Sequence, residues 1–424
     1  MNFDICIIGA GASGLAAAVT AAENTKGKIA IIEVKEQPGR KIAASGNGRC
    51  NLANANGKGY EETKKFFNHL GVMIKEEDEG RCYPHSENSA DVVEALVRQA
   101  TSLGVKIFTG CYAEEIEFEP EKFSIKCEKR ISKKKKEYFS LNCRRLLIAA
   151  GGKSMPELGT KGDGTIFARK AGHRIKPLIP VLTAVETMEN PKDRGYKGMR
   201  AKAGVKLTFK DNEIFSETGE VQFTEDGISG ICVFNLTRYM MIPKGKGFKD
   251  GFKDYRIYID FAPELSIDHS KDIIKESLRL FFARSSRTGI NQWDSQYVIK
   301  ETLLSIVRRE LAQEIARRVW FKTGIETFST EDNIEEIAEA INETLRYFIM
   351  EPKGVRGWNF AQVTKGGVDL GEIEETTMES KLVKGLYFAG EVTDYDGPCG
   401  GFNLQNAWIT GIHAGKAMAG SLEI

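Results

Sequence analysis

The chain has 424 residues, of which 41% are hydrophobic and 28% are charged, and its formal net charge is +1. The length favours two or three domains, and the composition is that of an ordinary globular protein. The near-neutral charge gives no reason to expect nucleic acid or an anionic membrane surface as a partner, and no apolar run has the length of a transmembrane helix.

The N-terminal residues have the order of a dinucleotide-binding unit. Residues 3–8 form an apolar run typical of a buried parallel strand, and residues 9–14 (GAGASG) fit the pattern G-x-G-x-x-G. The sequence predicts an alanine-rich helix over residues 15–22 and a second strand over residues 28–32 that ends in Glu33. Because strand, glycines, helix, strand and acid occur in the right order and spacing, we interpret this stretch as a dinucleotide site rather than an ordinary turn.

Three glycines and one acid carry this interpretation. Gly9 permits the tight turn, Gly11 lets the backbone approach a pyrophosphate, and Gly14 lets the helix pack closely on the strand. The helix N-terminus then directs free N–H groups at the phosphates. Glu33 is placed to accept hydrogen bonds from ribose hydroxyls, which favours FAD or NAD over a 2′-phosphorylated dinucleotide but does not distinguish between those two.

The loop after the second strand is rich in glycine, small polar residues and cations. We expect Arg40 and Lys41 to neutralise pyrophosphate charge, because a loop at this position lies near a bound dinucleotide. Residues 45–51 (SGNGRCN) are expected to pass close to a flat ring system.

The next part of the chain alternates between helical and strand-like patterns. Helices are predicted over residues 61–70 and 90–103, with a turn at residues 80–84 between them. A strand over 105–108 and an antiparallel meander follow, with a lysine run at 133–136 that we interpret as a solvated hairpin tip. The predicted strands of the meander are residues 111–119, 123–129 and 138–143.

Residues 145–152 form another apolar run, which ends in Gly151 and Gly152 and is expected to pass under the dinucleotide. From about residue 181 the pattern changes to strands followed by helices, which departs from βαβ alternation and predicts an inserted domain. Its predicted strands are 205–209, 221–223, 230–234 and 255–261, and its predicted helices are 269–284, 294–321 and 332–348.

The C-terminal region supplies a second edge that faces the dinucleotide. A predicted strand over residues 384–391 ends in Gly390 and Glu391, and a glycine-rich loop at 397–401 leads into a final helix that runs through Ala419. The dinucleotide-binding domain is therefore predicted to be discontinuous, because the inserted domain separates its two parts.

These motifs carry a family resemblance. The pairing of the N-terminal G-x-G-x-x-G and Glu33 with GLYFAGE at residues 385–391 is similar to the two-part FAD signature of glutathione-reductase-like flavoproteins. Residues 45–51, 366–368 (GGV) and 388–405, which contain FAGEV and DGPCGGFNLQ, resemble the HI0933-like family of NAD(P)/FAD-dependent, BaiN-type or aminoacetone-oxidase-family proteins. Phe402 stands where the resemblance leads us to expect tyrosine.

The resemblance implies an α/β fold with a discontinuous, Rossmann-like, glutathione-reductase-like FAD-binding domain. On this basis residues 1–180 and 361–424 would form the FAD-binding domain. Residues 181–265 with 349–360 would form a β-rich, barrel-like subdomain, and residues 266–348 a helical subdomain.

The resemblance also implies that the final helix places backbone N–H groups of Asn403 and Leu404 near the isoalloxazine, where a helix N-terminus stabilises negative charge on reduced flavin. The motifs and the resemblance together give these candidate cofactor-binding residues: Gly9, Gly11, Ala12, Ser13, Gly14, Glu33, Arg40, Lys41, Ser45, Gly46, Asn47, Gly151, Gly390, Glu391, Asn403 and Leu404.

The expected chemistry is hydride transfer between flavin and a small organic substrate, with NAD(P)H as a transient electron donor, since no second G-x-G-x-x-G occurs. The alternatives are an amine oxidase that uses O₂, and a flavin-dependent RNA-modification or redox-sensing module. Cys50 and Cys399, which lie in glycine-rich loops, are the only candidate catalytic residues. The scattered cysteines indicate no metal site and fit reduced thiols in the cytoplasm.

Overall fold

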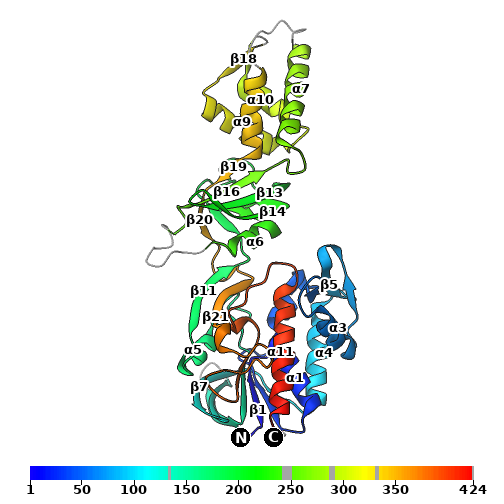
Figure 1. Ribbon diagram of the computed structural model, residues 1–424, viewed down its shortest axis with the longest axis vertical. Helices are drawn as coiled ribbons and strands as arrows, with labels where there is room; N and C mark the ends of the chain where they lie inside the picture. The colour runs from blue at the N-terminus through cyan, green and yellow to red at the C-terminus, as the bar shows by residue number, and fades with distance from the viewer. Residues whose placement is uncertain (132–134, 241–250, 286–291, 330–333, 423–424) are drawn as a thin grey trace. The chain divides into compact units, whose positions relative to one another are not determined.

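The computed structural model describes all residues except 132–134, 241–250, 286–291, 330–333 and 423–424 (Figure 1). The chain divides into two compact units: unit 1 comprises Met1–Val181 and Gly357–Ile424, and unit 2 comprises Leu182–Arg356. Residues 133 and 134 of the predicted lysine run at 133–136 lie outside the described residues. Within the described part of the chain, no helix is long and apolar enough to cross a membrane.

Unit 1 is built on a five-stranded parallel sheet with the order β22-β10-β1-β2-β6. The strands β1 and β2 are apolar along their whole length because both faces of the sheet are covered. The strands are β1 (Ile5–Ile8), β2 (Ile29–Ile32), β6 (Lys106–Phe108), β10 (Arg145–Ile148) and β22 (Leu386–Phe388).

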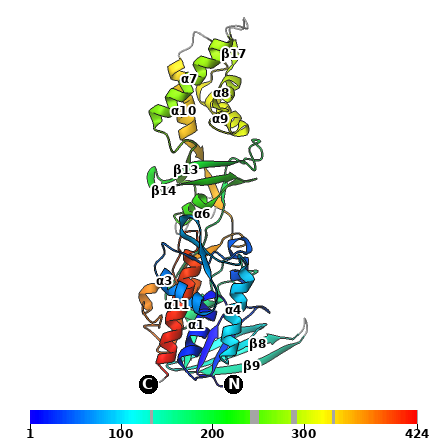
Figure 2. The ribbon, with the colours of Figure 1, turned by 90° about the vertical axis from the view of Figure 1, so that its right-hand side faces the viewer.

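Helices cover one face of this sheet and an antiparallel meander covers the other (Figures 1 and 2). The helices are α1 (Ala12–Asn24), α4 (Ser89–Ser102) and α11 (Phe402–Gly420). The meander consists of β7 (Cys111–Glu119), β8 (Lys122–Arg130) and β9 (Lys136–Cys143). The parallel sheet with these coverings confirms the predicted Rossmann-like α/β class.

The contact between α1 and α11 depends on small residues. A Cβ atom at Gly411 would overlap the backbone carbonyl of Ser13, and one at Gly415 would lie 2.6 Å from the carbonyl oxygen of Ala17. The two helices therefore approach each other at backbone distance, which only glycine at these positions permits.

Smaller elements join the sheet to the loops around its edge. They are α2 (Arg40–Ala44), the 3₁₀ helix η1 (Ser45–Gly48), α3 (Tyr60–His69), α5 (Asp163–Lys170), β11 (Ile175–Val181) and β21 (Val363–Val368). A three-stranded sheet is formed by β3 (Ala53–Asn54), β5 (Arg81–Pro84) and β4 (Ile74–Glu76). The predicted turn at 80–84 is wrong, because the turn is the 3₁₀ helix η2 (Asp78–Gly80) and residues 81–84 form β5, which pairs with a strand on each side.

Unit 2 contains a seven-stranded antiparallel sheet with the order β19-β16-β13-β14-β15-β12-β20. The strands are β12 (Val185–Thr187), β13 (Arg200–Phe209), β14 (Asn212–Phe223), β15 (Gly227–Ser229), β16 (Tyr255–Asp260), β19 (Phe348–Met350) and β20 (Pro352–Val355). The helices are α6 (Ile231–Thr237), α7 (Ile267–Ser285), α8 (Ser295–Leu303), α9 (Arg309–Thr323) and α10 (Ile334–Arg346), with a short β17 (Gln292–Asp294) and β18 (Thr327–Ser329) pair between them. One apolar core includes both the sheet and the helices.

Two predicted elements of unit 2 are wrong. The expected strand at 230–234 is the start of α6, which buries Cys232, Val233 and Leu236 at helical spacing after Gly230. The expected single helix over 294–321 is two helices, α8 and α9, because the backbone is extended at Arg308.

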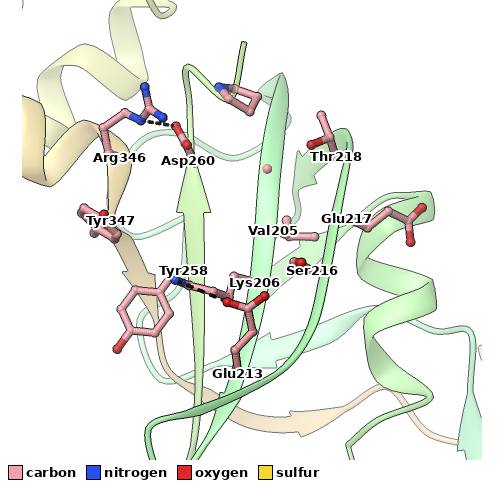
Figure 3. Close-up of a pocket in the computed structure, with 12 residues that line it drawn as sticks. Val205, Lys206, Glu213, Ser216, Glu217, Thr218, Tyr258, Asp260, Arg346 and Tyr347 are labelled. Atoms are coloured by element: carbon pink, nitrogen blue, oxygen red, sulfur yellow. Dashed lines mark ion pairs between the residues drawn. The ribbon is translucent and has the colours of Figure 1, made fainter. Parts of the chain in front are cut away.

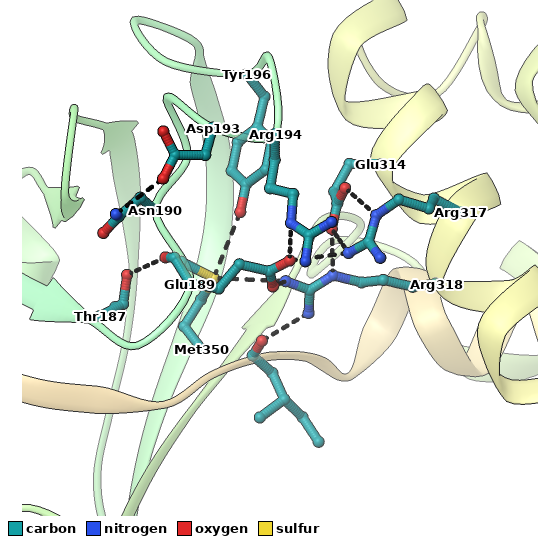
Figure 4. A network of polar contacts seen from close by, with 11 residues as sticks. Thr187, Glu189, Asn190, Asp193, Arg194, Tyr196, Glu314, Arg317, Arg318 and Met350 are labelled. Atoms are coloured by element: carbon teal, nitrogen blue, oxygen red, sulfur yellow. Dashed lines mark hydrogen bonds and ion pairs between the residues drawn. The ribbon is translucent and has the colours of Figure 1, made fainter.

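An ion-pair network with a buried carboxylate at its centre fixes α9 to the loop that follows β12 (Figure 4). Glu314 on α9 accepts hydrogen bonds from Arg317 at 2.7 and 2.8 Å and from Arg318 at 2.8 Å, and its side chain is only 2% exposed. Glu189 in the loop pairs with the same two arginines and with Arg194. Burial alone would raise the pKa of Glu314, but the two α9 arginines more than offset this and lower it.

Candidate functional site

The candidate residues gather at the carboxyl edge of the parallel sheet in unit 1. Gly9 follows β1, Glu33 follows β2, Gly151 follows β10 and Gly390 follows β22. In open α/β sheets, ligands bind outside the carboxyl ends of the strands. The fold therefore brings the N-terminal and C-terminal motifs to one edge, as the sequence predicts.

The three motif glycines have different surroundings. At Gly9, where φ is 107°, a Cβ atom would overlap the carbonyl of Ala149, and at Gly14 it would overlap the carbonyl of Gly9. At Gly11 a Cβ atom would meet nothing within 4 Å. Gly9 and Gly14 are thus required by packing, whereas Gly11 faces open space that a ligand can approach.

The N-terminus of α1 opens onto the same space. Gly11 is its N-cap and has no side chain to satisfy the N–H groups of the first turn, which include those of Ala12 and Ser13. The Ser13 hydroxyl itself donates to the Ala389 carbonyl at 3.1 Å and so holds α1 against the end of β22. The backbone of this turn, rather than the serine side chain, is available to an anion.

Glu33 is buried and binds the glycine loop. Its carboxylate accepts hydrogen bonds from the N–H groups of Ala10 at 2.7 Å and Lys35 at 2.8 Å. Burial raises the pKa of Glu33, and the two N–H donors oppose this shift. The carboxylate thus orders the loop around Gly11, which sequence reasoning did not foresee, and each oxygen keeps a lone pair for a ribose hydroxyl.

Lys41 and Glu391 form an ion pair between the two halves of unit 1. The Lys41 ammonium donates to Glu391 at 2.6 Å and to the Ser154 hydroxyl at 2.8 Å. The other oxygen of Glu391 accepts from Ser154 at 2.7 Å and from the N–H of Thr364 at 2.8 Å. Burial alone would raise the pKa of Glu391, but Lys41 and these donors lower it, so the carboxylate is charged.

Arg40 points elsewhere: its guanidinium donates to the carbonyl of Glu157 at 3.0 Å. Thus the two adjacent cations of the predicted loop have separate partners, and only Lys41 reaches Glu391.

Ser154 and Thr364 were missed by sequence reasoning. The Thr364 hydroxyl, which accepts from the N–H groups of Lys153 and Ser154, lies two residues before the recognised Gly366.

The loop formed by Ser45, Gly46 and Asn47 is left-handed at its centre, with φ of 58° at Gly46 and 56° at Asn47. The Ser45 hydroxyl donates to the Ile42 carbonyl at 2.7 Å, so its proton serves the turn. Gly46 and Asn47 are exposed. Cys50 is fully buried, and burial raises the pKa of its thiol to about 12, which makes a thiolate role at neutral pH unfavourable.

The glycine-rich loop before α11 is tied to its own helix and to β3. The Asn403 side chain accepts from the N–H of Gly397 at 2.8 Å and donates to the Gly397 carbonyl at 2.9 Å. Asn54 of β3 donates to the Gly400 carbonyl at 2.9 Å. The backbone N–H groups of the first α11 turn, which include that of Leu404, follow the N-cap Gly401 and have no side-chain cap.

Gly151 and Gly390 complete the edge. Gly151 has φ of 73° and no neighbour within 4 Å of a Cβ position, whereas at Gly390, with φ of 75°, a Cβ atom would overlap the Ser13 side chain.

The other candidate cysteine, Cys399, has its Sγ 3.9 Å from Oε1 of Gln362. No group of three or more acidic, histidine or cysteine residues placed to hold a metal ion occurs in the described part of the chain.

Unit 2 contains a separate pocket of about 570 Å³ on its sheet (Figure 3). Lys206 and Glu213, which both line it, form an ion pair at 3.8 Å, and Asp260 pairs with Arg346 at 2.9 Å. None of the predicted site residues lines this pocket. The candidate site therefore rests on unit 1.

The groups at the carboxyl edge of the unit 1 sheet fit a dinucleotide. The free N–H groups at the α1 N-terminus beside Gly11 can bind a pyrophosphate, and the Glu33 carboxylate can accept hydrogen bonds from a ribose. A family described as an FAD binding domain matches residues 4–110. The fold and the site define the class of this protein as an FAD-binding oxidoreductase.

Within that class the chain belongs to the HI0933-like family, because the family described as the HI0933-like protein Rossmann domain matches residues 59–417. The chain is 32% identical to a 3-dehydro-bile acid delta(4,6)-reductase of Clostridium scindens over 98% of each chain. It is 26% identical to ribosomal RNA dihydrouridine synthases of Haemophilus influenzae, over 95% of each chain, and of Escherichia coli, over 96% of each chain.

Proposed function

We propose that the protein uses FAD to transfer a hydride to a small organic substrate, with NAD(P)H as the electron donor. The observation that carries the proposal is the meeting of the N-terminal glycine loop and the Lys41–Glu391 pair at one sheet edge, in a chain that resembles a reductase over its whole length. FAD, when bound, supplies the hydride chemistry.

The residues of this edge have distinct roles in the proposal. The N–H groups that follow Gly11 bind the pyrophosphate, and Glu33 binds the adenosine ribose while ordering the glycine loop. Lys41 keeps Glu391 charged, so that its carboxylate accepts hydrogen bonds from the ribityl or pyrophosphate region. The α11 N-terminus at Leu404 stabilises negative charge near the isoalloxazine.

The relatives' names suggest the bond that is reduced. A delta(4,6)-reductase and a dihydrouridine synthase both have names that describe the addition of hydrogen to a carbon–carbon double bond. We infer the same reaction here: an electron-poor C=C bond, NAD(P)H and one proton give the saturated product and NAD(P)⁺. One carbon gains the hydride with its electron pair, and the neighbouring carbon gains the proton.

The first test is anaerobic spectroscopy of the purified protein. A bound flavin that bleaches on addition of NADH or NADPH, and recovers its absorbance when a 3-oxo-4,6-dienoic bile acid is added, supports the proposal. A flavin that remains oxidised with both nicotinamides contradicts the donor assignment. In that case, substrate-dependent peroxide formation with an amine would favour the oxidase alternative.

A second candidate substrate is uridine in RNA, because two relatives that cover 95% or more of the chain are ribosomal RNA dihydrouridine synthases. The same C=C reduction would apply to the uracil ring. Incubation of unmodified ribosomal RNA with the protein and NADPH, followed by mass spectrometry of nucleosides, tests it. A dihydrouridine signal above that of flavin-free protein favours RNA, and its absence with bile-acid turnover favours a small molecule.

A further inference from the structure

Reduction of a C=C bond needs a proton as well as a hydride, and none of the predicted cofactor-binding residues is assigned to supply it. We infer that Tyr83 is the proton donor of the reaction, acting at the point where the loop of residues 45–51 meets the loop before α11. This inference rests on the proposed function, because it assumes that a double bond is reduced at this edge of unit 1. It holds for either candidate substrate.

Tyr83 is buried, but its ring does not pack within the two apolar clusters of the protein. It lies on β5, where Cys82 points into the core of unit 1 but Tyr83 is not part of either core cluster, although it is only 8% exposed. Its ring instead packs beneath the predicted ring-binding loop, since a Cβ atom at Gly46 would lie 3.4 Å from its Cε1 atom. A buried aromatic ring under an exposed glycine loop indicates a site wall rather than core packing.

The strand β3, which pairs with the Tyr83 strand β5, is fixed to the loop before α11 and to α11 itself. Asn54 donates to the Gly400 carbonyl at 2.9 Å, and the Gln405 side chain accepts from the N–H of Asn54 at 2.8 Å. The Trp408 indole donates to the Leu52 carbonyl at 2.9 Å. The position of Tyr83 relative to the α11 N-terminus is therefore set by hydrogen bonds, as a catalytic group requires.

The Tyr83 hydroxyl is available. Buried tyrosine hydroxyls usually have a hydrogen-bond partner, yet this one makes no hydrogen bond within the described part of the chain. The hydroxyl oxygen itself is not fully buried, so it reaches accessible space. The geometry is a rigid ring with a free O–H group at the candidate site.

Charged groups lie around the Tyr83 ring and affect the pKa of its hydroxyl. The Arg49 guanidinium lies 4.1 Å from the ring centroid and is held by Glu77 at 2.6 Å. Burial raises the pKa of Tyr83, which keeps the phenol protonated at neutral pH. Arg49 and Arg81 oppose this rise, whereas Glu77 and Cys399 add to it. The two cations would stabilise the phenolate that remains after donation.

The step balances in atoms and charge. The carbon β to a carbonyl gains the hydride and its electron pair, the α-carbon gains the Tyr83 proton, and the phenolate regains a proton from solvent. NAD(P)H is the reductant that is consumed. Cys50 does not suit this role, because its buried thiol is not exposed to the site.

The test compares the holoprotein with Tyr83→Phe, which keeps the buried ring, and with Tyr60→Phe as a matched control, since Tyr60 lies in the same region, close to Cys82. Three quantities are measured: bleaching of the flavin by NAD(P)H, equilibrium binding of a 3-oxo-4,6-dienoic bile acid to the oxidised protein, and reoxidation of the reduced protein by that compound.

We expect Tyr83→Phe to slow reoxidation by about 100-fold or more, with bleaching and equilibrium binding changed less than about twofold, and Tyr60→Phe to change none of them. The wild-type reoxidation rate should fall only above the usual tyrosine pKa of 10.0. Equal reoxidation by wild type and Tyr83→Phe would overturn the inference alone. A wild-type protein whose reduced flavin is reoxidised neither by this compound nor by uridine-containing ribosomal RNA would overturn the proposed function, and the role of Tyr83 with it.

Discussion

Replacement of Gly11 by alanine separates binding of the dinucleotide from stability of the fold. The added methyl group would meet no atom within 4 Å, and the extended backbone at Gly11 (φ −85°, ψ −165°) suits alanine. The free energy of unfolding of the apoprotein should therefore stay the same or rise by up to about 1 kcal/mol. The same methyl group occupies the space through which a pyrophosphate reaches the first N–H groups of α1.

Loss of one charge-assisted hydrogen bond costs about 1.5–3 kcal/mol, so FAD affinity should fall by about 10–150-fold. Gly14→Ala is the matched control, because its methyl group would overlap the carbonyl of Gly9 and should lower the free energy of unfolding by about 1–3 kcal/mol. Calorimetric FAD titration and urea unfolding of both apoproteins measure the two effects. Wild-type FAD affinity in Gly11→Ala would refute the assignment of this space to the pyrophosphate.

Three further predictions concern titratable side chains that are buried or partly buried. Lys41→Met should destabilise the protein by about 1–3 kcal/mol at neutral pH because Glu391 loses its counter-charge. Urea unfolding measures this loss, and the double variant Lys41→Met/Glu391→Gln should recover part of it. Burial lowers the pKa of His173 below 6.5, so the unfolded chain binds a proton that the folded chain does not; the melting temperature should fall as the pH drops below 6.5, and less steeply in His173→Asn. Glu314→Gln should destabilise unit 2 by about 2 kcal/mol because Arg317 and Arg318 lose a partner, which hydrogen exchange in α9 would detect as faster exchange.

The sequence predicts the parallel sheet and its glycine-bearing edge because both depend on local patterns. Apolar runs define β1, β2 and β10, and the spacing of Gly9, Gly11 and Gly14 identifies the turn into α1. The family resemblance supplied FAD and is confirmed by the family match. The assignment of FAD contacts to individual residues, and the division of residues 181–360 into two subdomains, stay predictions.

Two of the errors, at residues 80–84 and 230–234, share a physical origin, because they concern segments whose structure depends on distant partners. Residues 81–84 form a strand only because β3 and β4 lie on either side, and a short apolar run such as 230–234 fits a strand or a helix until its packing is known. The Lys41–Glu391 pair joins residues at opposite ends of the sequence, and no periodicity relates them. Tyr83 belongs to the same category, since only the fold brings it to the glycine loops.

The glycine contact between α1 and α11 has a consequence for folding in the cell. At synthesis rates of about 5–20 residues per second, the ribosome takes roughly 20–75 s to proceed from Asn24 to Phe402. During that interval the apolar face of α1 has no C-terminal partner, and contacts between residues so far apart in sequence form slowly. We therefore expect nascent chains that lack α11 to expose this surface to chaperones and to bind FAD only after the last helix has emerged.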